Sequence, residues 1–442
     1  MRGGLQVSSG SLRRAGAVLL VLGVVGSTAA GPAYAEPSPS ASGEAGFRQP
    51  VAIAAAGDCA QKDVEAVPWS LQRVFLDELW GVDKDGKAHH TGDGVKVAVI
   101  DTGVDVGNPQ LGAAGKVIDG GDLLGDAQVR AGQQKPEGNA LSDKVGHGTK
   151  VAGIIAASPR TGVGFVGLAK DAKIISIRQN DAEGHGSVST LIDAIKKAMQ
   201  LDADVINISQ DVRVEVDPSK PADVPAFAED GQLEAVLKQA ESNGIVVVAS
   251  SGNDGAEGPT YPAKYDTVLA VGASDRNNER ATFSQYGDFV KVVAPGVDML
   301  STVPGGGQCT DNGTSFSAPY VSGLAAILKG QHKDWTPKQI RTVIEQTAQR
   351  TEHGHNKWIG WGVVDPVKAV SYTDTPSSSP TPDVPTKLDT VPLVAQPAGL
   401  EETQADRDRR TGTFVLGAGG LLVAGLAGGA IVARDMGRRR RH

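Results

Sequence analysis

Cysteine is scarce in this 442-residue chain, which contains only Cys59 and Cys309. Zinc sites combine cysteine, histidine and carboxylate ligands at short, regular spacings. No cysteine or carboxylate cluster of that spacing accompanies the histidines considered as ligands, which are His89, His90, His185, His353 and His355. We therefore expect no metal site and no other cofactor.

Aromatic residues make up only 4% of the chain, and its formal net charge is −8. Long aliphatic runs compensate for the few aromatics, so the chain can bury one large core. Residues 1–35 and 434–442 are net basic, and the acidic excess therefore lies between them. An acidic region of this kind is a poor partner for nucleic acid, and we expect none to bind.

The N-terminus has the pattern of a secretory signal peptide. Arg13 and Arg14 precede an apolar run at residues 15–26, and the small residues of Ala33-Tyr34-Ala35 follow it. This order of a basic start, an apolar centre and a small-residue cleavage site predicts a signal peptide over residues 1–35.

The C-terminus contains a second apolar run, at residues 411–433, which carries no charge. It is long enough to cross a bilayer as one helix, although a buried core helix is the alternative for such a glycine-rich run. The arginines of the tail 434–442 follow at once, which predicts a single pass with this tail in the cytoplasm. No Leu-Pro-x-Thr-Gly sorting signal precedes the run, so we expect permanent anchoring.

Between residues 95 and 369, patterns typical of strands alternate with patterns typical of helices. The predicted strands are Val95–Ile100, Lys173–Ile177, Val205–Ile208, Ile245–Ala249 and Val268–Val271. The predicted helices are Val188–Gln200, Leu233–Asn243, Thr314–Gly330 and Pro337–Thr347. This alternation predicts an α/β fold with a mainly parallel sheet and helices on both faces.

Three polar residues stand at informative places. Ser315 opens an apolar helix after Gly313, a residue that tolerates unusual backbone conformations. Asp101 ends the β-branched run Val95–Ile100, at the sheet edge where open α/β folds place their sites. His147 lies between two glycines, ahead of a helix of small residues. Each alone could be a helix cap or a turn residue, but together those explanations become improbable.

In the order Asp101, His147, Ser315, these segments resemble the subtilisin-like serine peptidases, for which this chain order is already known. Further similar segments are Asp204–Ser209, Ser250–Gly255, Tyr261–Tyr265 and Val293–Gly296. The resemblance implies a peptidase domain of subtilisin-like fold over residues 91–370 and a serine endopeptidase activity, a hydrolase reaction on protein or peptide substrates.

The resemblance also implies a role for each residue. Ser315 would be the nucleophile and His147 its base, since an ordinary histidine pKa of about 6.5 suits that task. Asp101 would orient the imidazole. The side-chain amide of Asn253, together with the backbone N–H of Ser315, would stabilise the oxyanion. The alternative for Asn253 is a loop asparagine that caps a turn.

Substrate-binding residues follow from the same resemblance. Gly186 would lie on one rim of the cleft, Ser209 on the opposite rim, and Thr260 at the floor of the primary pocket. Typical members have Leu-Gly-Gly after the serine of the Asn-x-Ser strand, whereas this chain has Gln210-Asp211-Val212. The lost glycines and the added carboxylate should narrow that rim, which favours narrow specificity over broad degradation.

Mycosins are membrane-bound subtilisin-like peptidases that accompany type VII secretion in actinobacteria, and they too depart from Leu-Gly-Gly. The chain is similar to them at Gly313–Phe316 and at Gly138–Asp143. Mycosins carry an N-terminal extension held to the domain by a disulfide. We therefore expect an extension over residues 36–90, held by a bond between Cys59 and Cys309.

The sequence thus predicts a membrane-anchored endopeptidase whose catalytic domain lies outside the cell. Residues 371–410, rich in Pro, Ser and Thr, would form a stalk between that domain and the membrane. Its partners would be a protein substrate and the type VII secretion machinery. One alternative is a mainly structural component that stabilises a secretion complex, with catalysis secondary. Another is a secreted nutritional protease, which permanent anchoring argues against.

Overall fold

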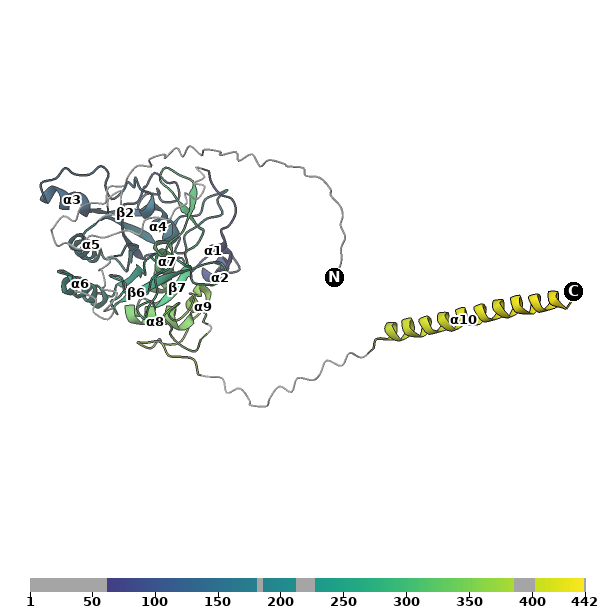
Figure 1. Cartoon of the computed structure of the whole chain (residues 1–442). Coiled ribbons are helices and arrows are strands. Elements are labelled where there is room, and N and C mark those ends of the chain that lie inside the picture. The colour runs from purple at the N-terminus through teal and green to yellow at the C-terminus, as the bar shows by residue number, and fades with distance from the viewer. Residues whose placement is uncertain (1–61, 181–185, 212–226, 351, 385–401, 441–442) are drawn as a thin grey trace, which may run out of the picture. The chain divides into compact units, whose positions relative to one another are not determined.

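The computed structural model describes residues 62–180, 186–211, 227–350, 352–384 and 402–440 (Figure 1). The chain forms two compact units, Met1–Asp383 and Val384–His442. The first unit contains the described strands and most of the helices, and the second contains one long helix. The predicted signal peptide, 1–35, lies outside the described residues.

A seven-stranded sheet forms the centre of the first unit. Its bounds are β1 Lys96–Asp101, β2 Val117–Asp122, β3 Lys173–Arg178, β4 Val205–Ile208, β5 Val246–Ser250, β6 Val268–Ser274 and β7 Val292–Pro295. All neighbouring strands are parallel, in the order β2-β3-β1-β4-β5-β6-β7. After β1 the chain adds β2 and β3 on one side of this strand, and it then crosses over to add β4 to β7 on the other side. The end of β1 therefore lies at a topological switch point, where α/β sheets open a crevice.

The helices of the first unit are α1 Trp69–Gln72, α2 Leu76–Leu79, α3 Leu123–Arg130, α4 His147–Ala156, α5 Val188–Gln200, α6 Asp230–Ser242, α7 Thr314–Gln331, α8 Pro337–Thr347 and α9 Pro366–Val370. A separate antiparallel pair consists of β8 Met299–Thr302 and β9 Gln308–Asp311. Every strand and helix predicted from the sequence is present, with small shifts at the ends.

Helices cover both faces of the sheet, as predicted (Figure 1). Val97 and Val99 of β1 pack into one core cluster with residues of α4 and α7. Ala98 and Ile100 pack into a second cluster with residues of α5 and α6. Because successive strand residues point to opposite faces, this alternation places β1 in the middle of a three-layer structure.

The described part of the predicted N-terminal extension packs onto this domain. Leu71, Val74 and Leu79 are buried in the same cluster as α4 and α7. The indole N–H of Trp69 donates to the backbone oxygen of Val297 at 3.0 Å. These contacts join residues 62–90 to the core near β8.

The second unit contains α10, Gln404–Arg439, a 36-residue helix that includes the predicted span 411–433. Its most apolar 18-residue window has a mean hydropathy of 2.1, so the helix is long and apolar enough to cross a membrane. Its large apolar side chains are exposed, among them Phe414, Leu416 and Leu421. Among the residues that the structure describes, α10 is the one helix that could span a membrane.

Candidate active site

Asp101 and His147 form the best-defined contact of the site. Asp101 is the last residue of β1 and is fully buried, and His147 is the first residue of α4. Nδ1 of His147 lies 2.8 Å from Oδ1 of Asp101, a hydrogen bond in which the imidazole donates. The backbone N–H of Thr102 donates to the same oxygen, also at 2.8 Å. This pairing holds the imidazole in the tautomer whose Nε2 can accept a proton.

Glycines allow α4 to start against the end of β1. An ideal Cβ on Gly148 would lie 2.1 Å from the backbone oxygen of Gly103, so no larger residue fits there. Gly146 has a φ of +86°, a left-handed conformation that favours glycine. The Gly-His-Gly pattern therefore brings the imidazole close to the strand end and its carboxylate.

Ser315 lies in the first turn of α7 and is 4% exposed. The rings of His147 and Phe316 are 5.4 Å apart between centroids, so the start of α7 lies beside the imidazole. Oγ of Ser315 donates to the backbone oxygen of Ser209 at 2.9 Å. For His147 to accept its proton, the hydroxyl would have to turn from that oxygen toward the imidazole, and such loose geometry is common in enzymes without substrate.

Asn253 lies in the loop after β5 and contacts the residue before the serine. Its Oδ1 accepts hydrogen bonds from the backbone N–H and the hydroxyl of Thr314, at 2.8 and 2.9 Å. These bonds orient the side chain and leave its NH₂ group as the donating end. Nδ2 lies 3.6 Å from the position of an ideal Cβ on Gly313. The amide N–H therefore faces the turn that carries Ser315, where helix-start N–H groups also lack helical partners.

Ser209 is joined to Ser315 by two hydrogen bonds. Besides accepting the bond from Ser315, Ser209 donates its own hydroxyl to the backbone oxygen of Ser315, at 2.9 Å. Nδ2 of Asn207 donates to Oγ of Ser209 at 2.8 Å, and Ser322 of α7 donates to Oδ1 of Asn207 at 2.9 Å. All four residues are buried. This network, which ties β4 to α7, was not predicted from the sequence.

Thr260 contacts Ser251 and Gly252, the two residues that precede Asn253. Its Oγ1 donates to the backbone oxygen of Ser251 at 3.0 Å. An ideal Cβ on Gly252 would lie 3.1 Å from Cγ2 of Thr260 and 3.4 Å from Oδ2 of Asp211. Thr260 and the unusual carboxylate of Asp211 therefore meet at the residue that precedes Asn253.

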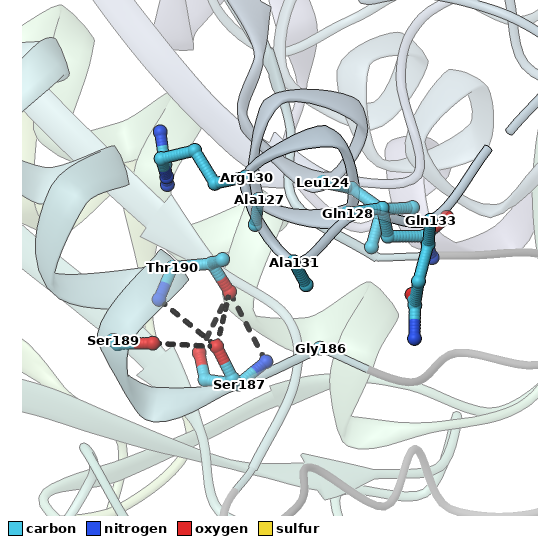
Figure 2. Close-up of a pocket in the computed structure, with 10 residues that line it drawn as sticks. All are labelled: Leu124, Ala127, Gln128, Arg130, Ala131, Gln133, Gly186, Ser187, Ser189 and Thr190. Carbon is cyan, nitrogen blue, oxygen red and sulfur yellow. Dashed lines mark hydrogen bonds between the residues drawn. The ribbon is translucent and has the colours of Figure 1, made fainter. Parts of the chain in front are cut away.

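Gly186 lies beside a cavity of about 540 Å³. Figure 2 shows this cavity between side chains of α3, such as Leu124 and Arg130, and the start of α5 at Ser187 and Thr190. The walls that the structure describes do not include the four predicted catalytic and oxyanion residues. An ideal Cβ on Gly186 would lie 2.2 Å from Nε2 of Gln179, so a larger residue would have to displace that side chain.

Charged groups around His147 set its protonation. Burial lowers the pKa of His147, but the charge of Asp101 and its hydrogen bond raise it, and the net result is a raised pKa. Lys150 lowers this pKa, and Asp143 raises it. Nζ of Lys150 is itself paired with Oδ2 of Asp311 at 2.7 Å. The imidazole therefore becomes a free base at a higher pH than an ordinary histidine.

Of the two cysteines, Cys309 is buried in β9. Cys59 lies outside the described residues, so the bond between them remains a prediction.

A buried carboxylate bonded to a histidine, with a serine at a helix start beside the ring, has the chemistry of a serine hydrolase. Residues 92–362 match the Peptidase S8 family, described as the subtilase family. The chain belongs to this family and is a subtilisin-like serine endopeptidase.

Curated relatives and solved structures agree with this assignment. Subtilisin BL of Lederbergia lenta is 36% identical over 304 residues, which are 68% of this chain and 97% of the relative. Subtilisin E of Bacillus subtilis (strain 168) is 36% identical over 310 residues, which are 69% of this chain and 72% of the relative.

Among solved structures, MycP1 from Mycobacterium smegmatis is similar with a TM-score of 0.60 and 30% identity, over 78% of this chain and 94% of that one. MycP3 protease from the type VII (ESX-3) secretion system has a TM-score of 0.60 and 29% identity, over 75% of this chain and 95% of that one. The chain is therefore similar in structure to proteases of type VII secretion systems, as the resemblance to mycosins predicted.

Proposed function

We propose that the chain is a membrane-anchored processing endopeptidase that uses Ser315, His147 and Asp101 as its catalytic triad. The observation that carries this proposal is the 2.8 Å bond between His147 and a fully buried Asp101, beside a serine at the start of α7. In such a triad, Ser315 is the nucleophile, His147 the base and Asp101 the group that orients the base.

The proposed reaction proceeds in two halves. Oγ of Ser315 attacks the carbonyl carbon of the scissile peptide bond while Nε2 of His147 takes the hydroxyl proton. The oxyanion that forms is stabilised by the Nδ2 group of Asn253 and the backbone N–H of Ser315. His147 then gives its proton to the leaving amine as the C–N bond breaks. Water then attacks the acyl-enzyme, with His147 again as the base, and the second product leaves as Oγ of Ser315 regains its proton.

We further propose narrow specificity. Asp211 and Gln210 replace the glycine-containing segment that typical relatives have, and both are buried. Because Asp211 approaches Gly252 next to Thr260, its carboxylate occupies space near the proposed primary pocket. A site restricted in this way favours a few substrates over general degradation.

The C-terminal helix supports a proposal for where the protein acts. We propose that α10 crosses the cell membrane once, with the arginines after residue 433 in the cytoplasm and the catalytic domain outside. Residues 371–410 then act as a stalk. The structural similarity to MycP1 and MycP3, which are described as parts of type VII secretion systems, supports a link of this chain to such machinery.

The bond between Cys59 and Cys309 is part of the same proposal. Disulfides persist outside the cell, where both cysteines would lie. The bond would tie the N-terminal extension to β9, close to the nucleophile segment in sequence. Peptide mapping without reduction should recover one linked peptide that contains both residues. Recovery of both thiols in free form would remove the bond from the account.

The second candidate function is a mainly structural one, in which the protein stabilises a secretion complex. The proposed membrane anchor α10 and the altered rim at Gln210 and Asp211 favour it. Cells that carry wild type, Ser315→Ala or a full deletion would separate the two by their secreted proteins. We expect a few secreted proteins to stay uncut in both mutant strains. If secretion fails in the deletion and Ser315→Ala behaves as wild type, the scaffold is the essential function and processing is not.

A further inference from the structure

Asp143 is a buried carboxylate outside the proposed triad, and its side chain is held by five donors. Its Oδ1 accepts hydrogen bonds from the backbone N–H groups of Gly146 and Val145, at 2.8 and 3.1 Å, and from the hydroxyl of Thr102 at 2.9 Å. Its Oδ2 accepts from the N–H and the hydroxyl of Thr149, both at 2.8 Å. Only 4% of the residue is exposed, so water does not replace these bonds.

These donors flank both members of the proposed Asp–His pair. Gly146 comes directly before His147, and Thr149 lies in the same first turn of α4. Thr102 comes directly after Asp101, and its hydroxyl also accepts the N–H of Gly148 at 3.0 Å. A single carboxylate therefore joins the end of β1 to the turn and helix that carry the imidazole.

The hydroxyl of Thr102 has two carboxylates within reach and one proton to donate. Its Oγ1 lies 2.9 Å from Oδ1 of Asp143 and 3.3 Å from Oδ1 of Asp101. The shorter and stronger contact is the one to Asp143. When this hydroxyl donates its hydrogen bond to Asp143, Oδ1 of Asp101 stays available as the acceptor for His147 and the Thr102 N–H.

We propose that Asp143 is a positioning residue for catalysis, which holds the imidazole of His147 against Asp101 and draws the Thr102 hydroxyl away from Asp101. The role rests on the proposed triad, because Asp143 acts only through these groups and not on the substrate.

A pH signature follows from the charges around the imidazole. Asp101 faces His147 from β1, Asp143 from the preceding loop, and Lys150 from α4, with Asp311 of β9 paired to Lys150. Phe316 of α7 adds an uncharged ring. Removing the charge of Asp143 takes away one attraction for the imidazolium and lets Thr102 turn to Asp101. Both changes lower the pKa of His147.

The test uses a reaction that needs no known substrate. The rate of labelling by an alkyl fluorophosphonate depends on the nucleophile and its base. We would measure this rate on the full-length membrane protein from about pH 5 to pH 9, the range in which histidines titrate. Asp143→Asn keeps the shape of the side chain but places an amide where Thr149 donates. Asp122→Asn is the matched control, because Asp122 is a buried carboxylate that caps α3 and is bonded to other groups.

For Asp143→Asn we expect labelling at high pH to fall about 10- to 100-fold, the size of effect that a small misplacement of catalytic groups produces. The midpoint of its acid limb should shift to lower pH, whereas Asp122→Asn should keep the wild-type midpoint. An unchanged midpoint in Asp143→Asn would overturn the proposal and leave a purely structural carboxylate.

Two further variants distinguish a failure of the proposed role of Asp143 from a failure of the proposed triad. If Asp143→Asn fails to fold, Thr149→Val removes one of its donors, and a wild-type profile for that variant overturns the inference. His147→Ala tests the triad itself, because labelling that survives in it contradicts the proposed function. Labelling lost in His147→Ala, with no shift in Asp143→Asn, overturns only the role of Asp143.

Discussion

Two opposing effects act on His147, and their balance decides when it can act as a base. Burial lowers its pKa and the charge of Asp101 raises it, with a net rise. A raised pKa in the folded protein means that the Asp–His pair stabilises the fold fully below the unfolded pKa of about 6.5, and that this stabilisation is lost as the pH rises through the folded value. The proposed mechanism needs the neutral imidazole, which forms only as the pH rises through this raised pKa.

Asn253 offers a direct test of oxyanion stabilisation. We expect Asn253→Ala to lose about 100- to 1000-fold in turnover, the size already measured for the corresponding asparagine of subtilisin. The cause would be the loss of the Nδ2 donor, while Thr314 stays in the helix start. Turnover and circular dichroism of the same samples would check this. A folded variant with wild-type turnover would remove Asn253 from the mechanism.

Glu345 provides a test of stability that is independent of catalysis. Burial in α8 raises its pKa to about 7, although the charges of Lys291 and Arg341 lower it. In the unfolded chain this carboxyl ionises near pH 4.5, whereas in the folded protein it ionises only near pH 7. The buried carboxyl therefore lowers the free energy of unfolding increasingly from about pH 4.5 to pH 7, and by a constant amount above pH 7. The full penalty is about 3 kcal/mol, since one pKa unit corresponds to about 1.4 kcal/mol.

We therefore expect Glu345→Gln to raise the free energy of unfolding at pH 8 and to change it little at pH 5. Urea unfolding at both values would measure the difference. Glu78→Gln, at an exposed position, is the control and should change little at either pH. Equal effects of Glu345→Gln at both values would contradict the buried-carboxyl account.

Among the elements, the contact between β4 and α7 holds Ser315, the proposed nucleophile, in place. Ser322→Ala would leave Oδ1 of Asn207 buried without its donor, which costs about 1–3 kcal/mol. Unfolding in urea would measure this loss, and Ser242→Ala at the exposed end of α6 would serve as control. A Ser322→Ala protein as stable as wild type would show that the network contributes little.

The same elements show what the sequence could and could not predict. The strands of the sheet centre have β-branched runs such as Val205–Ile208, and these were predicted with nearly correct bounds. β2 was missed because Gly120 and Gly121 interrupt its pattern.

The site shows a similar division. Motifs identified Asp101, His147 and Ser315 because each stands beside glycines or at an element end. The bonds of Ser209 to Ser315 join residues that are 106 positions apart, and no local pattern records such a pairing. Asp143 is similar, because its acceptor role depends on how β1 and α4 meet.

For the whole molecule, we expect the first compact unit to carry out catalysis and the second to anchor the protein. A chain that ends at Asp383 should leave the membrane fraction and keep its reactivity toward a fluorophosphonate, because the folded domain lies before that residue. Fractionation of cells that make each form would test this. Retention of the shortened chain in the membrane would mean that α10 is not the anchor.

The central claim is that Ser315, activated by His147, is the nucleophile of a working peptidase. The most direct measurement is labelling of the full-length protein, in the cell fraction that contains it, with a fluorophosphonate, followed by mass spectrometry of the modified peptide. Ser317→Ala is the matched control, since Ser317 is buried two residues further along α7 and donates to the backbone oxygen of Ala294. We predict an adduct on Ser315 in wild type and in Ser317→Ala, and none in Ser315→Ala. Labelling that persists in Ser315→Ala, or an absence of labelling in folded wild type, would contradict the account.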